Sequence, residues 1–189
     1  STALGIGAFG IGLTEFVIMG LLPQVATELS VSLPSAGLLV SGYALGVTIG
    51  GPLLTLLTSR LPQRAVLMLL MAIFTIGNVL CAISPSYGLV LAARVVTGFA
   101  HGTFFGTGSV VAQSLVPEDR KASAIALLFT GLTLATVLGL PFGTWLGQAY
   151  GWRMTFWVVS AIGAIAFAAI ALALPRGSAG EPLNWRDLA

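Results

Sequence analysis

Residues 88–116 read GLVLAARVVTGFAHGTFFGTGSVVAQSLV. The run contains one arginine, one histidine and no acidic residue. A helix needs about 20 mainly apolar residues to cross the hydrocarbon core of a bilayer, and this run exceeds that length. The stretch therefore predicts a membrane-spanning helix.

The composition of the whole chain agrees with this interpretation. Hydrophobic residues make up 57% of the 189 positions and charged residues 7%, whereas a soluble domain carries roughly 25% charged residues. Eight basic and six acidic residues leave a net charge of only +2, which excludes an extended nucleic-acid-binding patch. We expect a multi-pass protein of the cell membrane, most simply a bacterial inner membrane, surrounded by lipid and without a nucleic-acid partner.

Six segments qualify as spans, so we expect an all-α membrane protein with residues 1–174 in one six-helix bundle. The expected spans are Ala3–Val25, Ser35–Thr58, Ala65–Ser84, Gly88–Val116, Ala122–Tyr150 and Met154–Leu174. Residues 175–189 are polar and rich in Gly and Pro, and they are expected to form a cytoplasmic tail.

The basic residues between the spans predict the orientation. Six lie on one side of the expected membrane: Arg60, Arg64, Arg120, Lys121, Arg176 and Arg186. Only Arg153 lies on the other side, and Arg94 falls within a span. The positive-inside rule then places both termini in the cytoplasm.

Glu15, Arg94 and His101 are ionisable residues within the expected spans. A charge near the bilayer centre costs about 3 kcal/mol on insertion scales, so such residues are functional candidates. At 1.5 Å per residue, Glu15 lies about 15 Å below the outer end of its helix, and Arg94 and His101 lie about 10 and 20 Å below theirs. Arg94 and His101 are seven residues apart and share a helix face with Gly98.

Two interpretations of these residues remain open. In the functional one, Glu15 is a proton carrier or a counter-charge for the substrate, because burial disfavours its ionised form and a nearby arginine favours it. In the structural one, Glu15 and Arg94 form a static pair, or a charge is bonded to backbone carbonyls and only orders the bundle, and His101 only makes a hydrogen bond between helices. The same alternatives apply to the uncharged cavity-lining candidates Asn78, Thr97 and Gln113.

Glycines recur at every fourth position in three spans, which favours close helix packing. The members are Gly42, Gly46 and Gly50, then Gly98, Gly102 and Gly106, then Gly139, Gly143, Gly147 and Gly151. No phosphate-binding loop, metal-ligand cluster or nucleophile–base pair is recognisable, so we expect no cofactor and no enzymatic activity.

Several motifs resemble those in the N-terminal half of transporters of the major facilitator superfamily. The stretch Ser59-Arg60-Leu-Pro62-Gln63-Arg64 is similar to the cytoplasmic loop signature Asp-Arg-x-Gly-Arg-Arg: both arginines match, but Ser59 replaces the acid. The run from Arg94 to Gly102 resembles the helix 4 signature Arg-x-x-x-Gly-x-x-x-Gly, whose arginine is implicated in proton coupling.

Two further groups of residues narrow the resemblance to drug and sugar efflux members. Gly139-Leu-Pro141-Phe-Gly143 is similar to the antiporter signature of helix 5, although Leu140 separates its glycine and proline. The phrases Thr14-Glu15-Phe16 and Gly151-Trp152-Arg153-Met154-Thr155-Phe156 resemble the arabinose-exporter-like members in particular.

The resemblance implies one half of a twelve-helix secondary transporter working by alternating access, with a small-molecule substrate and a proton as partners. It implicates Arg94 in proton coupling, and the positions of Glu15 and His101 within spans make them candidates for the same coupling. A gate is expected at Ser59, Arg60 and Arg64, and a bend at Pro141. The second half would be another copy in a homodimer or a missing C-terminal half, since the tail resembles the start of the family's central linker. A passive carrier or channel, or a non-transporting half, stays the alternative.

Overall fold

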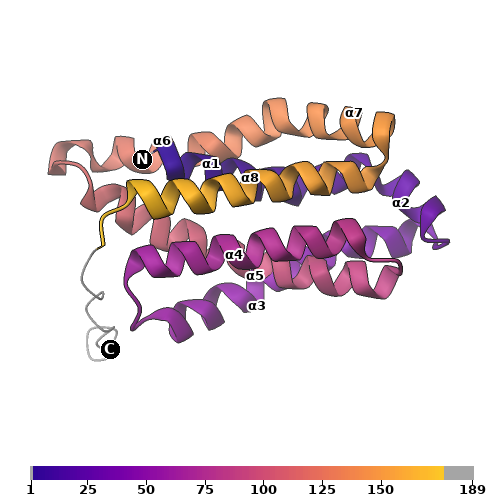
Figure 1. Ribbon diagram of the computed structural model, residues 1–189, viewed down its shortest axis with the longest axis horizontal. Helices are drawn as coiled ribbons and strands as arrows, with labels where there is room; N and C mark the ends of the chain where they lie inside the picture. Colours follow the sequence, from indigo (N-terminus) through magenta and orange to yellow (C-terminus); the bar gives the residue numbers. More distant parts are fainter. Residues whose placement is uncertain (1, 177–189) are drawn as a thin grey trace.

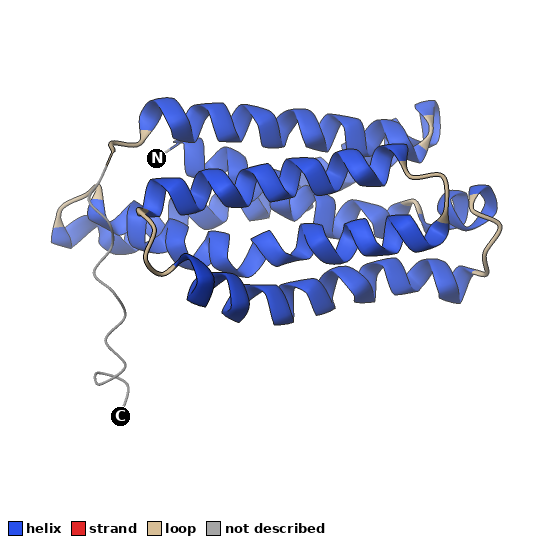
Figure 2. Cartoon of the chain, turned by 60° about the horizontal axis from the view of Figure 1, so that its bottom comes forward, coloured by secondary structure: helices blue, strands red, loops and turns tan. Residues whose placement is uncertain are grey.

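The computed structural model describes residues 2–176, and this part of the chain is a bundle of helices without strands. Six helices long and apolar enough to span a membrane run along the bundle, and their connections lie at its two ends (Figure 2). The predicted tail from residue 177 onward, including Arg186, lies outside the described residues.

The segments in chain order are α1 Thr2–Val17, a 3-10 turn Ile18–Gly20, α2 Leu22–Glu28, α3 Leu33–Thr58, α4 Gln63–Ile83, α5 Tyr87–Ser114, a 3-10 turn Glu118–Arg120, α6 Lys121–Leu134, a π-helical turn Ala135–Gly139, α7 Leu140–Tyr150 and α8 Trp152–Ala173. The all-helical, six-span prediction is confirmed, and the last five spans begin and end within two residues of the helices.

The first span differs from the prediction. A single helix to Val25 was expected, but α1 ends at Val17, and α2 follows after the 3-10 turn. Pro23 stands in the first turn of α2, where its missing N–H leaves no hydrogen bond unmade. Because Pro23 cannot donate to the Met19 carbonyl oxygen and its ring clashes with that group, one regular α-helix does not continue through this position.

The long helices pack against one another around a shared core. α3 packs mainly against α5, and α4 packs against both α5 and α8, while α1 packs against α6 and α8. α1 begins at the end of the bundle where α8 finishes, as an even number of crossings requires (Figure 1). Gly151 connects α7 to α8 with φ of 95°, a left-handed conformation that favours glycine.

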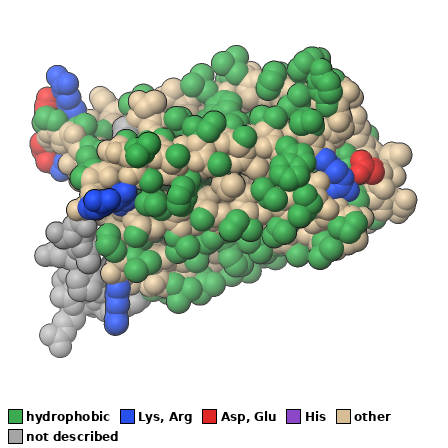
Figure 3. All heavy atoms as spheres, viewed as in Figure 1, with side chains coloured by type: hydrophobic (Ala, Val, Ile, Leu, Met, Phe, Trp, Pro, Cys, Tyr) green, Lys and Arg blue, Asp and Glu red, His purple; other side chains and the backbone are tan. Residues whose placement is uncertain are grey.

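The surface matches a protein that faces lipid. Large apolar side chains such as Leu57, Val137 and Leu172 are more than 60% exposed, and Lys, Arg, Asp and Glu gather at the two ends of the bundle (Figure 3). A water-soluble protein rarely exposes such a continuous apolar surface. The chain is therefore an integral membrane protein; which end faces the cytoplasm stays a prediction.

Candidate functional site: an intramembrane polar cluster

Arg94 lies fully buried in α5 and binds backbone atoms of two other helices. Its Nη1 donates to the Thr14 carbonyl oxygen of α1 at 2.7 Å, and its Nε donates to the Leu39 carbonyl oxygen of α3 at 3.3 Å. Its Cζ lies 4.5 Å from the centroid of the Tyr43 ring. Carbonyl dipoles and an aromatic face thus hold the cation, so α1, α3 and α5 meet at this residue.

Thr14 and Asn78 complete the buried part of the cluster. The Thr14 hydroxyl donates to Asn78 Oδ1 at 2.6 Å, and Asn78 Nδ2 donates to the Phe74 carbonyl oxygen in its own helix at 2.9 Å. Both side chains are fully buried. Asn78, predicted as a cavity-lining candidate, therefore joins α4 to α1.

Glu15 approaches His101 rather than Arg94. Glu15 Oε2 lies 3.7 Å from His101 Nδ1, and within the described chain His101 is the only basic side chain within 4.0 Å of that carboxylate. The Glu15 side chain is 30% exposed, compared with 16% for His101. The static Glu15–Arg94 pair, one of the two interpretations left open by the sequence, is not formed in this structure.

Tyr43 of α3 connects the two basic residues. Its hydroxyl lies 3.2 Å from His101 Nδ1, and the face of its ring covers the Arg94 guanidinium. Sequence reasoning missed Tyr43 and Thr14. A buried tyrosine hydroxyl usually finds a partner, so the position of Tyr43 inside a span and next to Gly42 was an available signal.

The remaining cavity-lining candidates bond within their own helix. The Thr97 hydroxyl donates to the Ala93 carbonyl oxygen at 2.7 Å, and Gln113 Nε2 donates to the Ser109 carbonyl oxygen at 3.1 Å. Thr97 is 1% exposed and packs beside Gly77 of α4. The structure does not bring either residue to the Glu15–His101 contact.

The predicted loop gate lies between the C-terminal end of α3 and the first turn of α4. The Ser59 hydroxyl donates to the Leu56 carbonyl oxygen at 2.8 Å, and Arg60 is exposed. Arg64 donates from Nη2 to the Ala171 carbonyl oxygen, near the C-terminus of α8. A cation there stabilises the negative end of the helix dipole, so Arg64 joins α4 to α8.

The glycines at the α3–α5 contact allow close packing of backbones. A Cβ added to Gly98 would collide with the Tyr43 carbonyl oxygen, and one added to Gly102 would lie 3.2 Å from Gly51 Cα. Gly139 and Gly143 instead accommodate side chains of α1, among them Leu13. Gly106 has no atom within 4 Å of such a Cβ, so the stripe on α5 is only partly used for packing.

The helix bend predicted at Pro141 coincides with a local change in hydrogen bonding. The π-helical turn Ala135–Gly139 comes directly before α7, and the Leu140 N–H donates to the Ala135 carbonyl oxygen, five residues back. Proline cannot donate to the carbonyl four residues earlier and its ring clashes with it, so a widened turn accommodates it.

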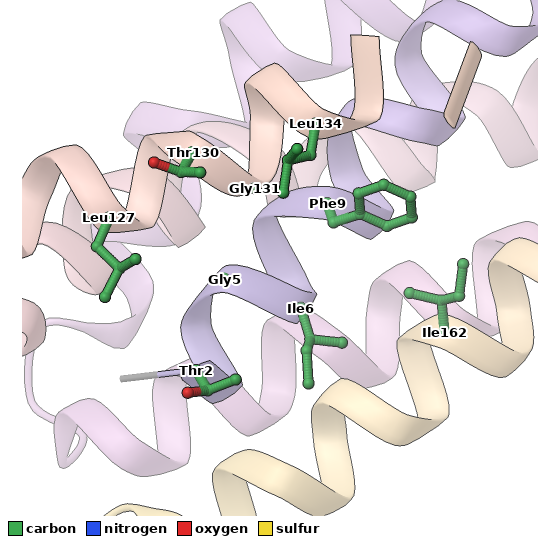
Figure 4. A pocket seen from close by; sticks show the side chains of 9 residues that line it. All are labelled: Thr2, Gly5, Ile6, Phe9, Leu127, Thr130, Gly131, Leu134 and Ile162. Atoms are coloured by element: carbon green, nitrogen blue, oxygen red, sulfur yellow. The ribbon is translucent and has the colours of Figure 1, made fainter. Parts of the chain in front are cut away.

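An apolar pocket of about 400 Å³ lies apart from the polar cluster. It is formed by α1, α6 and α8, as the side chains in Figure 4 show. Its lining residues are Thr2, Gly5, Ile6, Phe9, Leu127, Thr130, Gly131, Leu134 and Ile162. Since none of them is charged and Glu15 is not among them, the pocket does not belong to the candidate site.

Comparison with known proteins identifies the family. The family model described as Major Facilitator Superfamily matches residues 4–187. The chain belongs to the major facilitator superfamily. The chain is 53% identical to the inner membrane transport protein YdhP of Escherichia coli over 99% of its own length and 48% of that protein. It therefore spans about half the length of the curated relatives that it matches.

Other relatives and a solved structure agree with this assignment. The chain is 38% identical to the putative transporter AraJ of Escherichia coli, over 92% of its length and 44% of AraJ. It is 35% identical to a chloramphenicol resistance protein of Streptomyces lividans, over 96% of its length and 48% of that protein. The fold matches the proton:xylose symporter XylE with a TM-score of 0.82 at 16% identity, covering 92% of this chain and 44% of XylE.

Proposed function

We propose that this chain is the N-terminal half of a proton-coupled exporter of a small organic solute, such as a drug or a sugar, in a bacterial inner membrane. It acts as a transporter and not as an enzyme. Membership of the major facilitator superfamily supports transport, and the name of YdhP supports the inner membrane. The similarity to a chloramphenicol resistance protein supports efflux as the direction.

The observation that carries the proposal is the environment of the Glu15 carboxylate. It lies in a membrane-spanning helix, is partly exposed, and contacts a histidine instead of a permanently charged arginine. Burial favours the neutral form of an acid, and a fixed arginine partner would oppose its protonation. Because no such pair holds Glu15, this carboxylate is suited to take up and release a proton.

Arg94 has a different role in this proposal. Its guanidinium binds the backbone of α1 beside Glu15 and the backbone of α3, and no bond in the described structure ties it to a carboxylate. Arg94 therefore holds three helices together and provides a fixed positive potential near Glu15. Protonation of Glu15 would then shift the equilibrium of these three helices between their inward-facing and outward-facing arrangements.

A second six-helix unit completes the cavity. In the family fold the two halves are parallel repeats with the substrate site between them. We propose that the unit is supplied either by the remainder of a longer polypeptide or by a second copy of this chain. The matched relatives are about twice as long, which favours the first source.

The test is transport by the whole protein in proteoliposomes with an imposed pH gradient, with labelled chloramphenicol and arabinose as probes. We expect Glu15→Gln to reduce gradient-driven transport at least tenfold, whereas Glu118→Gln, at an exposed surface pair, leaves it unchanged. Unchanged transport by Glu15→Gln would favour the passive carrier instead. If the wild type moves neither probe with the gradient, this result contradicts the proposed efflux of drugs or sugars.

A further inference from the structure

Two side chains from different helices compete for one nitrogen atom of His101. The Tyr43 oxygen lies 3.2 Å from Nδ1, and Glu15 Oε2 lies 3.7 Å from the same atom. Tyr43 belongs to α3 and Glu15 to α1, while His101 belongs to α5. Tyr43 is only 2% exposed, so its hydroxyl has little access to solvent as an alternative partner.

A hydrogen bond donated by Tyr43 to Nδ1 and one donated by Nδ1 to Glu15 require different protonation states of that nitrogen. An unprotonated Nδ1 accepts a hydrogen bond from the Tyr43 hydroxyl and has no proton to donate to Glu15. A protonated Nδ1 cannot accept from Tyr43 and donates to the Glu15 carboxylate or to the Tyr43 oxygen, of which the charged carboxylate is the stronger acceptor. The hydrogen bond at one ring nitrogen thus sets the tautomer of the whole ring.

We propose that Tyr43 is a positioning residue that keeps His101 Nδ1 unprotonated and thereby leaves the Glu15 carboxylate free to exchange protons and substrate. This inference rests on the proposed proton-coupled function. Nδ1 gains a proton only when the Tyr43 bond breaks. That proton comes from the Glu15 carboxyl group, leaving an imidazolium–carboxylate pair, or from solvent while the Nε2 proton is released.

The surroundings of His101 leave Tyr43 and Glu15 as the groups in direct contact with Nδ1. α1, α3, α4 and α6 all pack against α5. On the α4 side the titratable group is buried Cys81, which lies near Arg94. On the α6 side Phe129 stacks on Phe105, whose ring lies 5.1 Å from the His101 ring.

Arg94 fixes the orientation of Tyr43. The guanidinium lies over the Tyr43 ring and is itself bound to backbone oxygens, so the ring cannot turn without disturbing that contact. Close packing of Gly98 against the Tyr43 carbonyl oxygen holds the backbone of α3 in place as well. The hydroxyl is therefore directed at Nδ1 by two independent constraints.

The experiment uses the fact that this sequence contains a single histidine. We would label histidine with 15N in the whole transporter and assign the His101 resonances by their loss in His101→Gln. In the wild type, above the pH at which the ring becomes charged, we expect Nδ1 to be unprotonated and to accept a hydrogen bond. A protonated Nδ1 in the neutral wild-type ring would overturn the proposal.

Tyr43→Phe keeps the ring over Arg94 and removes only the hydroxyl. We expect Nδ1 to become protonated in this variant, because it loses its donor and still faces Glu15. Tyr87→Phe is the matched control, since the Tyr87 hydroxyl also joins α5 to α3, at the Ser35 carbonyl oxygen. We expect it to leave the His101 spectrum unchanged. An identical His101 spectrum in wild type and Tyr43→Phe would overturn the proposal.

The pH profile of transport gives a second readout. A protonated Nδ1 stabilises the ionised form of Glu15, so half-maximal transport should move to lower pH in Tyr43→Phe, by about one pH unit. An unchanged midpoint, with Glu15→Gln still inactive, would leave proton coupling intact and overturn the role of Tyr43. If the spectra are as expected but no pH-driven transport occurs, the role of Tyr43 in setting the His101 tautomer would be supported and the proposed function contradicted.

Discussion

Arg94 Nη1 lies 2.7 Å from the carbonyl oxygen of Thr14, the residue immediately before Glu15. The arginine therefore holds the helix that carries the acid without neutralising the acid itself. This arrangement separates two tasks that a Glu–Arg pair would combine. In the proposed function, the cation fixes the packing of the helices, and the neighbouring carboxylate stays available for protonation.

Replacing Arg94 by lysine tests the structural task. A lysine keeps the positive charge, but its single ammonium cannot reproduce the planar set of donors that reaches Thr14 and Leu39 together. We expect Arg94→Lys to lower the free energy of unfolding by about 2 kcal/mol, the range for a charge-assisted hydrogen bond. Unfolding can be followed by a thiol-reactive dye, because Cys81 is the only cysteine and is buried.

Arg60→Lys is the control for this measurement, since Arg60 is exposed at the end of α3. It should unfold like the wild type. Equal stability of Arg94→Lys and the wild type would mean that the bonds of Arg94 to the backbone contribute little.

A second group of contacts lies at the end of the bundle where α2 and α4 finish and α8 begins. Arg153 donates from Nε to Glu28 Oε1 at 2.9 Å and from Nη1 to the Ser84 carbonyl oxygen at 2.7 Å. Trp152 Nε1 donates to the other Glu28 oxygen at 2.8 Å. We expect Arg153→Met to reduce the free energy of unfolding by about 2 kcal/mol, because α2, α4 and α8 lose their shared donor.

The matched variant for Arg153→Met is Lys121→Met, which breaks the ion pair with Glu118 on the surface. Such pairs contribute about 0–1 kcal/mol, so this variant should change stability by no more than about 1 kcal/mol. A similar loss in both variants, measured with the same dye, would contradict the special role of Arg153.

Two glycines of α5 that look equivalent in sequence should respond differently to alanine. A methyl group at Gly98 meets the backbone of α3, whereas one at Gly106 meets no atom within 4 Å. We expect Gly98→Ala to destabilise the protein by about 2 kcal/mol through overpacking. Gly106→Ala should be neutral or stabilising by up to ~1 kcal/mol, because alanine is the better helix former. The reverse order would show that the α3–α5 seam is not tightly packed.

Sequence reasoning succeeded where one property dominates. The scarcity of charge and the length of the apolar runs determine the six spans, and the family motifs identify half of the major facilitator fold. The break after Val17 was missed, because apolar content alone does not distinguish one long helix from a helix followed by a short turn and a second helix.

The candidate site was only partly predictable. Glu15, Arg94 and His101 stand out as ionisable residues within spans, and the structure brings all three to one cluster. Which of them pair depends on side-chain direction and helix crossing, so the contact of Glu15 with His101 could not be obtained from depth along the helices. Tyr43 escaped notice because a tyrosine in an apolar run is usually a packing residue.

Pro141 allows a test of the bend. The widened turn Ala135–Gly139 lies directly before Pro141, whose nitrogen cannot donate to the carbonyl oxygen four residues earlier. We expect Pro141→Ala to convert this turn into regular α-helix, so that α6 and α7 become one continuous helix. Backbone amides of residues 135–140 should then exchange with deuterium more slowly, and the protein should unfold at a higher temperature.

Pro52→Ala is the matched control, because Pro52 lies inside α3 without an accompanying π-helical turn. Its effect on exchange in residues 135–140 should be negligible. If the bend between α6 and α7 serves transport, Pro141→Ala should also slow turnover more than Pro52→Ala does, at equal probe binding. Faster exchange in Pro141→Ala would show that the turn is imposed by packing against α1, through Gly139 and Gly143, and not by the proline.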